Sequence, residues 1–242
     1  MTTVRYLPPS RPASLDAVFA RIGAVAPLDP EDKVFLGTLG DWRSDPPGAR
    51  LVRGGDEDAR LLTQGWAARV RWLGDGRRQI FNFHLAGDLL QLPLRTATDA
   101  AIVALTAVQT VDAGLLIHAA RTDRAGPALI RAVEESDAFD ASLIMDQVVR
   151  LGRLQAYERM AHLILELYRR AVSAGLAVEG RMPFPLTQEM LADATGLSIV
   201  HVNRMLQRLR TERLVDVRHG QLALINHSGL SDLCALSADP NR

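Results

Sequence analysis

The chain has 242 residues, of which 48% are apolar and 23% charged, ordinary values for a folded soluble protein. Its 28 basic and 28 acidic residues balance, so any affinity for nucleic acid must come from a local concentration of charge. The single cysteine, Cys234, excludes an intramolecular disulfide and a zinc or iron–sulfur site built on several cysteines of one chain.

No segment of the sequence is expected to enter a membrane. The first residues, MTTVRYLPPSRPASL, lack the apolar run of a secretory signal. The longest nearly apolar run, AAIVALTAV from Ala100, has about half the length that a membrane-spanning helix needs. We therefore expect a cytoplasmic protein that has no membrane partner.

The N-terminal half is predicted to be a β-domain preceded by short helices. Residues 1–13 are rich in Pro, Ser and Arg and predict a loosely packed start, and short helices are expected between Leu15 and about Asp41. Between residues 48 and 120, glycine-containing turns separate short, partly alternating segments. Two of them, WAARVRWL and RQIFNFHL, flank a Gly-Asp-Gly turn and predict a hairpin. Many short strands of this kind indicate a sandwich or barrel-like domain.

Helical periodicity begins near Pro127. A narrow apolar stripe of the coiled-coil kind follows, formed by Ala141, Ile144, Val148 and Leu151. This stripe spans barely two heptads, so two interpretations stay open: a seam between two chains, or packing on the chain's own β-domain. The next helix, AYERMAHLILELYRR, has the wider apolar face that is typical of a globular core.

Two helices joined by a tight turn are predicted in the segment LTQEMLADATGLSIVHVNRMLQRLR, which begins at Leu186. Thr187 can cap the first helix, Gly196 supplies the turn, and Ser198 can cap the second helix. The following segment, LVDVRHGQLALIN, predicts a hairpin around Arg218. The four elements together are typical of a winged helix-turn-helix.

The second of these helices carries cations and no acidic residue. Arg204, Arg208 and Arg210 lie away from its apolar side. A helix in the DNA major groove presents base-contacting groups from its first turns and places cations near phosphates, and an arginine can bind guanine through two hydrogen bonds. A surface helix with solvated arginines is the alternative, but the order of helix, glycine turn, helix and wing favours a DNA-binding function.

The order of β-domain, long helix and winged helix resembles the Crp/Fnr family of bacterial transcription regulators. The resemblance covers residues 15–228 and is carried by the helix-turn-helix segment above and by GWAARVRWLGDGRRQIFNFHLAGDLL. It implies an α+β fold with a homodimer on the long helix, a near-palindromic operator in double-stranded DNA, and RNA polymerase as a protein partner. The parts that it implies are a cyclic-nucleotide-binding-like jelly-roll or β-roll sensor domain at 14–125, a dimerisation helix at 126–155, a winged helix-turn-helix at 156–228 and a tail at 229–242.

The resemblance also implies roles along the recognition helix. Ile199, Val200 and Arg204 take the base-contacting positions, and Ser198 and His201 would meet phosphates. Only Arg204 keeps the familiar chemistry, because Ile199 and Val200 replace residues that are often polar and could touch only thymine methyl groups. The DNA-contacting residues that we expect are Thr187, Ser198, Ile199, Val200, His201, Asn203, Arg204, Arg208 and Arg218.

The sensor half departs from the ligand-binding members that this family contains. No Gly-Glu pair follows Gly87-Asp88, and Arg95 precedes its Thr-Ala pair too early to hold a cyclic phosphate as in the cyclic-AMP binders. The N-terminal cysteine cluster of the iron–sulfur members is absent. His84 and His118 are the candidates for haem ligation, although strand histidines are usually structural. We therefore expect no cyclic nucleotide, iron–sulfur cluster or haem, which leaves an unknown small ligand or regulation by abundance.

Catalysis is not expected from this sequence. Its six histidines show no HExxH spacing, and neither a GxGxxG segment nor a Walker-type loop is present. The alternative function that we keep open is a ligand-sensing β-roll module whose winged helix contacts a protein partner rather than DNA.

Overall fold

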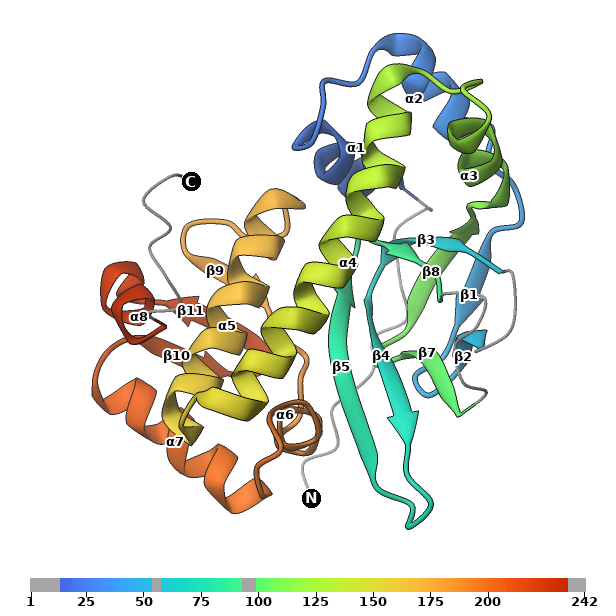
Figure 1. Ribbon diagram of the computed structural model, residues 1–242. Coiled ribbons are helices and arrows are strands. Elements are labelled where there is room, and N and C mark those ends of the chain that lie inside the picture. The colour runs from blue at the N-terminus through green and yellow to red at the C-terminus, as the bar shows by residue number, and fades with distance from the viewer. Residues whose placement is uncertain (1–13, 54–57, 93–98, 235–242) are drawn as a thin grey trace. The chain divides into compact units, whose positions relative to one another are not determined.

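The computed structural model describes residues 14–53, 58–92 and 99–234 (Figure 1). The chain divides into two compact units, which are described separately below. The first comprises the residues up to Ala67 together with His84–Val133, and the second comprises Ala68–Phe83 together with the chain from Glu134 onward. The predicted loose packing of residues 1–13 lies outside the described residues.

The first unit contains short helices and two sheets. The helices are α1 (Asp16–Gly23), α2 (Pro30–Gly37) and α3 (Gly114–Arg121). One sheet has the order β1-β8-β3-β6, and in the other β2 pairs with β7. The strands of this unit are β1 (Arg43–Asp45), β2 (Arg50–Arg53), β3 (Arg60–Gln64), β6 (Leu89–Leu90), β7 (Ala100–Ala104) and β8 (Val108–Asp112). The hairpin strands β4 (Trp66–Trp72) and β5 (Arg78–Leu85) lie mostly in the second unit.

Two apolar clusters form the core of this unit. In the first cluster, helices pack on a sheet, as Val18 of α1 and Leu36 of α2 do on Leu61 of β3. In the second cluster, side chains of the two sheets meet, among them Leu62 of β3 and Ile102 of β7. Successive residues of β3 enter different clusters, Leu61 the first and Leu62 the second, so this strand is buried on both faces, as in a sheet packed between helices and a second sheet. The predicted β-domain is therefore confirmed.

Local chemistry explains the start of α2. The Asp29 carboxylate accepts the backbone N–H of Asp32 at 2.7 Å, and the Asp32 carboxylate accepts the backbone N–H of Asp29 at 3.3 Å. Pro30 occupies the first helical position, where a missing N–H costs nothing. Helices α1 and α2 are the short helices expected between Leu15 and about Asp41. The short strand β1 was not expected, because its residues show no alternating pattern and it forms through pairing with β8.

The second unit is mainly helical, apart from the hairpin strands and one small antiparallel sheet of order β10-β11-β9. Helix α5 packs against α6, α7 and α8. The elements are the greater part of α4 (Pro127–Arg153), then α5 (Ala156–Ser173), β9 (Arg181–Pro183), α6 (Gln188–Thr195), α7 (Ile199–Thr211), β10 (Val215–Arg218), β11 (Gln221–Leu224) and α8 (His227–Leu233). The α+β fold, with a long helix and a C-terminal winged helix-turn-helix, is as predicted.

Helix α8 occupies a segment that was predicted to be a tail from residue 229 onward. The Asn226 side chain accepts the backbone N–H of Gly229 at 3.0 Å and so caps the helix. Leu230 is fully buried, which fixes α8 to the rest of the unit. The ordered C-terminal part therefore extends to at least Cys234.

A buried arginine joins α4 to α5. Arg150 is only 2% exposed, and its guanidinium donates to the side chains of Gln147 and Glu166. The same group lies 2.9 Å from Nδ1 of His162. Because arginine stays protonated, this nitrogen must act as the acceptor, so the imidazole is neutral. A charge buried to this degree is tolerated only when its donors are satisfied, and the carboxylate and amide provide that.

We predict that His162 makes folding sensitive to acid. Burial, and then the charge of Arg150, lower the pKa of His162 from 6.5 to about 4. Unfolding therefore takes up a proton between these two values, so the free energy of unfolding should fall as the pH falls from about 6.5 toward 4. Because the ring is partly exposed, we expect a loss on the order of 1 kcal/mol. Urea unfolding at pH 7 and pH 5 measures it.

His162→Asn is the matched variant, because its amide oxygen can accept from Arg150 but does not titrate. Glu166, Arg169 and Asp146, whose pKa is raised by burial, remain in both proteins. The difference between the two pH profiles therefore isolates His162. Equal losses of stability in the two proteins would contradict the assignment.

Candidate nucleic-acid interface

The helix-turn-helix is built from local capping interactions. The Thr187 hydroxyl accepts the backbone N–H of Met190 at 3.2 Å and starts α6. Gly196 ends α6 with φ of 67°, a left-handed conformation that side chains disfavour. The Ser198 hydroxyl then accepts the backbone N–H of His201 at 3.3 Å and starts α7. The predicted caps and turn are therefore confirmed at each position.

Side chains from other elements bind the last carbonyl groups of α6. The Gln79 amide of β5 donates to the carbonyl of Asp193 at 2.8 Å. The Gln147 amide of α4 donates to Ala194 at 2.6 Å, and the Arg159 guanidinium of α5 donates to Thr195 at 3.2 Å. An ion pair of 2.7 Å between Arg78 and the Asp193 carboxylate adds a further contact to β5. The end of α6 is thereby held in place just before the turn.

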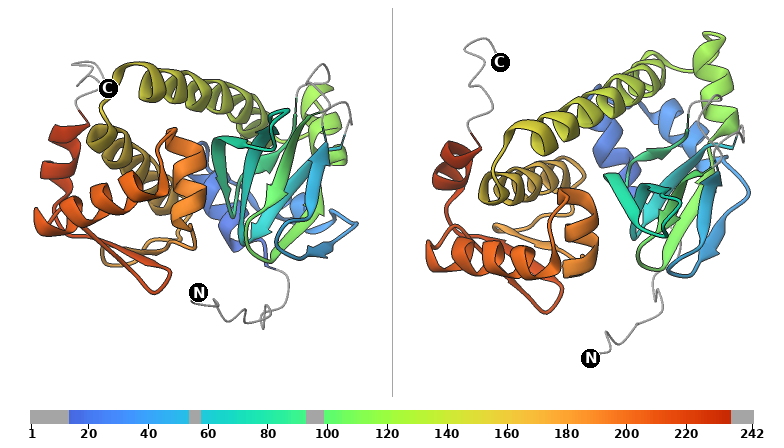
Figure 2. Two further views of the ribbon diagram at one scale, coloured as in Figure 1. Left: turned by 90° about the horizontal axis from the view of Figure 1, so that it is seen from below. Right: turned by 60° about the horizontal axis from the view of Figure 1, so that its bottom comes forward.

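Helix α7 has one buried face and one exposed polar face. Val202 and Leu209 are fully buried and pack the helix on the unit. On the opposite side of α7 lie four residues that are three or four positions apart in the sequence and therefore share one face of the helix. They are Val200, Asn203, Arg204 and Gln207, all of them exposed. Figure 2 shows the β10–β11 hairpin beside α7 in both views.

The first turns of α7 combine hydrogen-bonding groups with exposed apolar ones. The Ser198 hydroxyl lies 2.9 Å from Nδ1 of His201. Ile199 and Val200 are 51% and 67% exposed. Within the described part of the chain, Arg204 has no ion-pair or hydrogen-bond partner. Its guanidinium is therefore available to an external acceptor.

Arg208 lies on α7 beyond Arg204, but its guanidinium is already engaged. It donates to the Glu212 carboxylate at 2.7 Å and stacks over the ring of Tyr157 at 3.9 Å. The Tyr157 hydroxyl donates to the same carboxylate at 2.5 Å. Hydrogen bonds from Tyr157 and Arg208 hold the pKa of Glu212 below its usual value. This ion pair was not predicted, although the spacing of four residues between Arg208 and Glu212 signals it.

The wing is a tight hairpin with positive charge near its tip. His219 and Gly220 both have positive φ, the conformation of the turns that join two-residue hairpins. Arg218 is exposed and lies 3.0 Å from the carboxylate of Asp216. Arg210 of α7 binds the same carboxylate at 2.9 Å, which connects the wing to the recognition helix.

The apolar stripe on α4 is partly exposed in the single chain. Ala141 is exposed, Val148 is 66% exposed, and Ile144 and Leu151 are half-buried. Met145, which was not part of the predicted stripe, is 64% exposed on the same side. These positions present apolar surface along one face of the helix.

The two histidines that were candidates for haem ligation differ in burial. His84 is buried in β5 with its ring 4.0 Å from the Asp88 carboxylate, whereas His118 is exposed on α3. Arg95, the arginine compared with the phosphate-binding residue of the cyclic-AMP binders, lies outside the described residues. Among the described residues, no three potential metal-ligating side chains come together. No helix among them is both long and apolar enough to cross a membrane.

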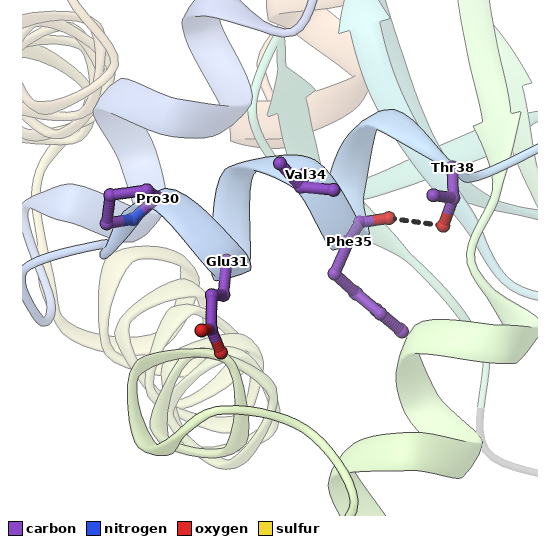
Figure 3. Close-up of a pocket in the computed structure, with 5 residues that line it drawn as sticks. All are labelled: Pro30, Glu31, Val34, Phe35 and Thr38. Atoms are coloured by element: carbon purple, nitrogen blue, oxygen red, sulfur yellow. Dashed lines mark hydrogen bonds between the residues drawn. The ribbon is translucent and has the colours of Figure 1, made fainter.

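A shallow pocket lies along α2, far in sequence from the helix-turn-helix (Figure 3). Its lining is mainly apolar, and the Thr38 hydroxyl donates to the carbonyl of Phe35 at 2.7 Å within it. All of its lining residues come from one helix and its end, so no polar groups converge from different elements as in a typical ligand site. The lining residues are Pro30, Glu31, Val34, Phe35 and Thr38.

Comparison with known proteins identifies the family. Residues 158–233 match the model of the Crp-like helix-turn-helix domain. The nitrogen fixation regulation protein FixK of Bradyrhizobium diazoefficiens is 31% identical over 177 residues, which cover 72% of this chain and 73% of FixK. This chain belongs to the Crp/Fnr family. It is a DNA-binding transcription regulator of the Crp/Fnr type and not an enzyme.

Two further Crp/Fnr-related proteins support the comparison. The structure of FixK2 from Bradyrhizobium japonicum has a TM-score of 0.70 and 28% sequence identity, and covers 82% of this chain and 98% of FixK2. The transcriptional activatory protein AadR of Rhodopseudomonas palustris is 28% identical over 156 residues, which are 64% of either chain. The FixK2 match confirms the expected Crp/Fnr fold.

We predict that Gly196 is required because its backbone is left-handed, and not because a side chain at this position would lack space. An added Cβ would meet Leu151 at 3.4 Å, an ordinary contact, so the cost should come from the positive φ. Gly196→Ala should lower the free energy of unfolding by about 1–2 kcal/mol. Gly196→Asn should cost less, because asparagine adopts this conformation more readily. Urea unfolding of the three proteins decides, and equal costs for Ala and Asn would contradict this explanation.

Proposed function

We propose that this Crp/Fnr regulator binds a near-palindromic operator as a homodimer, without cyclic AMP, and acts with RNA polymerase in the cytoplasm. Each α7 would enter the major groove of one half-site. In this arrangement, Ile199, Val200 and Arg204 face base edges, and Ser198, His201 and Arg208 face phosphates. Asn203, Thr187 and Arg218 complete the DNA-contacting set.

The observation that carries the proposal is the outward face of α7. It begins at a capped N-terminus, exposes an arginine that has no partner among the described residues, and includes no acidic side chain in the helix. Backbone N–H groups at a helix start favour phosphates, and a guanidinium matches the acceptor pair of guanine. The match of residues 158–233 to a Crp-like helix-turn-helix domain supports DNA binding by this part of the chain.

The partly exposed apolar stripe on α4, with Met145 beside it, supports the homodimer. Val148 and Met145 are each exposed by about two thirds in the single chain, at 66% and 64%. Apolar residues at heptad spacing are buried when two such helices pair. A dimer also places two recognition helices about one DNA turn apart, which gives enough base contacts for specific binding.

The proposal is tested first by selecting bound duplexes from a random library. A DNA-binding regulator should retard duplex at low salt, lose affinity steeply as salt rises, and enrich an inverted repeat. A winged helix that serves a protein partner instead would enrich no sequence and show no salt-sensitive retardation.

We predict that Arg204→Ala and Arg208→Ala weaken DNA binding in different ways. Loss of Arg204 should cost about 1–3 kcal/mol on the selected operator and weaken discrimination at one position of each half-site. Loss of Arg208 should weaken all duplexes about equally and lower the salt slope by roughly one for each phosphate that is no longer neutralised. Affinities for operator and scrambled duplex across a salt series measure both effects.

Glu212→Gln is the control for Arg208, because it removes the carboxylate that competes with phosphate for this guanidinium. It should raise affinity for both duplexes if Arg208 contacts phosphate. If Arg204→Ala and Arg208→Ala reduce specific and nonspecific binding in the same proportion, the proposed placement of α7 in the groove is wrong.

We predict that Ile144→Glu with Val148→Glu dissociates the dimer. The change would bury carboxylates against their symmetry mates, at a cost of about 3–5 kcal/mol or more. Analytical ultracentrifugation should show monomers, and operator affinity should fall with them. Val148→Glu alone, at an exposed position, disturbs the monomer least, and Val178→Glu is the control at an equally exposed site outside α4. A monomeric unmodified protein would contradict the proposed dimer.

A further inference from the structure

Two adjacent apolar residues are exposed at the start of α7. Ile199 is 51% exposed and Val200 67% exposed. Exposed apolar side chains are common on protein surfaces and need no explanation when they are scattered. These two, however, occupy the first turn of the helix that the proposed function places in the major groove, and polar or cationic side chains surround them.

Val200 shares its face of the helix with Arg204. The two residues are four apart, so they lie on the same side and one turn from each other, opposite the buried Val202 and Leu209. Four residues advance about 6 Å along the helix axis, whereas successive base pairs are about 3.4 Å apart. If Arg204 meets a base edge, Val200 therefore meets an edge one or two base pairs away.

The chemistry of that edge follows from the side chain. A valine neither donates nor accepts a hydrogen bond, so against cytosine N4 or adenine N6 it would displace water and leave a polar group unpaired. The thymine C5-methyl is the one apolar group that a standard base presents in the major groove. The same reasoning applies to Ile199, although that residue lies closer to the buried face of the helix.

We propose that Val200, flanked by Ile199, is a specificity-determining residue that contacts a thymine methyl beside the base bound by Arg204. This inference rests on the proposed function, because it requires α7 to lie in the major groove. It adds the chemical nature of one operator position. The neighbours Asn203, Arg204 and Gln207 are polar or cationic, which suits a base edge better than an apolar protein surface.

The test removes single methyl groups from the selected operator. Uracil keeps the hydrogen-bonding pattern of thymine and lacks only the C5-methyl. With the unmodified protein, replacing one thymine of a half-site by uracil should weaken binding about fourfold, the equivalent of one buried methyl group. With Val200→Ala, the same replacement should have little effect. At that position, 5-methylcytosine should also bind more tightly than cytosine, by a similar factor.

The matched control is Val178→Ala, which truncates a valine of the same 67% exposure outside α7 and should keep the full response to uracil. Thermal unfolding confirms that the variants fold. If the unmodified protein selects an operator but no thymine responds to uracil, or Val200→Ala responds equally, this inference is wrong while the proposed function stands. If Val200→Ala leaves every DNA affinity unchanged, Val200 does not contact DNA and this inference is likewise wrong. If no operator is selected, both fail.

Discussion

The carbonyl groups at the end of α6 impose the constraint on which the DNA-binding half depends. The last backbone carbonyls of a helix have no partner within the helix, and leaving them buried and unpaired is costly. Here Gln79, Gln147 and Arg159 satisfy three of them, each from a different element. Tertiary contacts therefore set the position of α6. Because the turn at Gly196 is short, it fixes the position of α7 relative to α6.

Gln147 connects this constraint to the buried charge between α4 and α5. Its amide oxygen accepts from Arg150, while its amide nitrogen donates to the carbonyl of Ala194. Arg150 in turn is neutralised by Glu166 on α5. Because each group has a fixed donor or acceptor role, a shift of α5 along α4 would leave at least one of them unsatisfied. The network therefore favours one arrangement of the three helices.

The sequence predicted those features whose signals are local. Thr187, Gly196 and Ser198 could be assigned because caps and turns depend on a few neighbouring residues. The contacts that hold α6 could not be predicted, since Gln79 is distant in sequence and polar residues of this kind usually lie on the surface. The strand β1 exists only through pairing with β8, and α8, whose Ser- and Gly-containing sequence resembles a loop, depends on the burial of Leu230.

The contacts at the end of α6 also show that the DNA-binding part depends on residues outside it. The segment that matches the family model, residues 158–233, contains Arg159 but leaves Gln79 and Gln147 outside. Cut from the chain, this segment would lose donors from both β5 and α4. A unit defined by sequence similarity is thus smaller than the unit that is physically complete. Exchange of winged helices between relatives would therefore require the β5 and α4 positions to be inherited along with them.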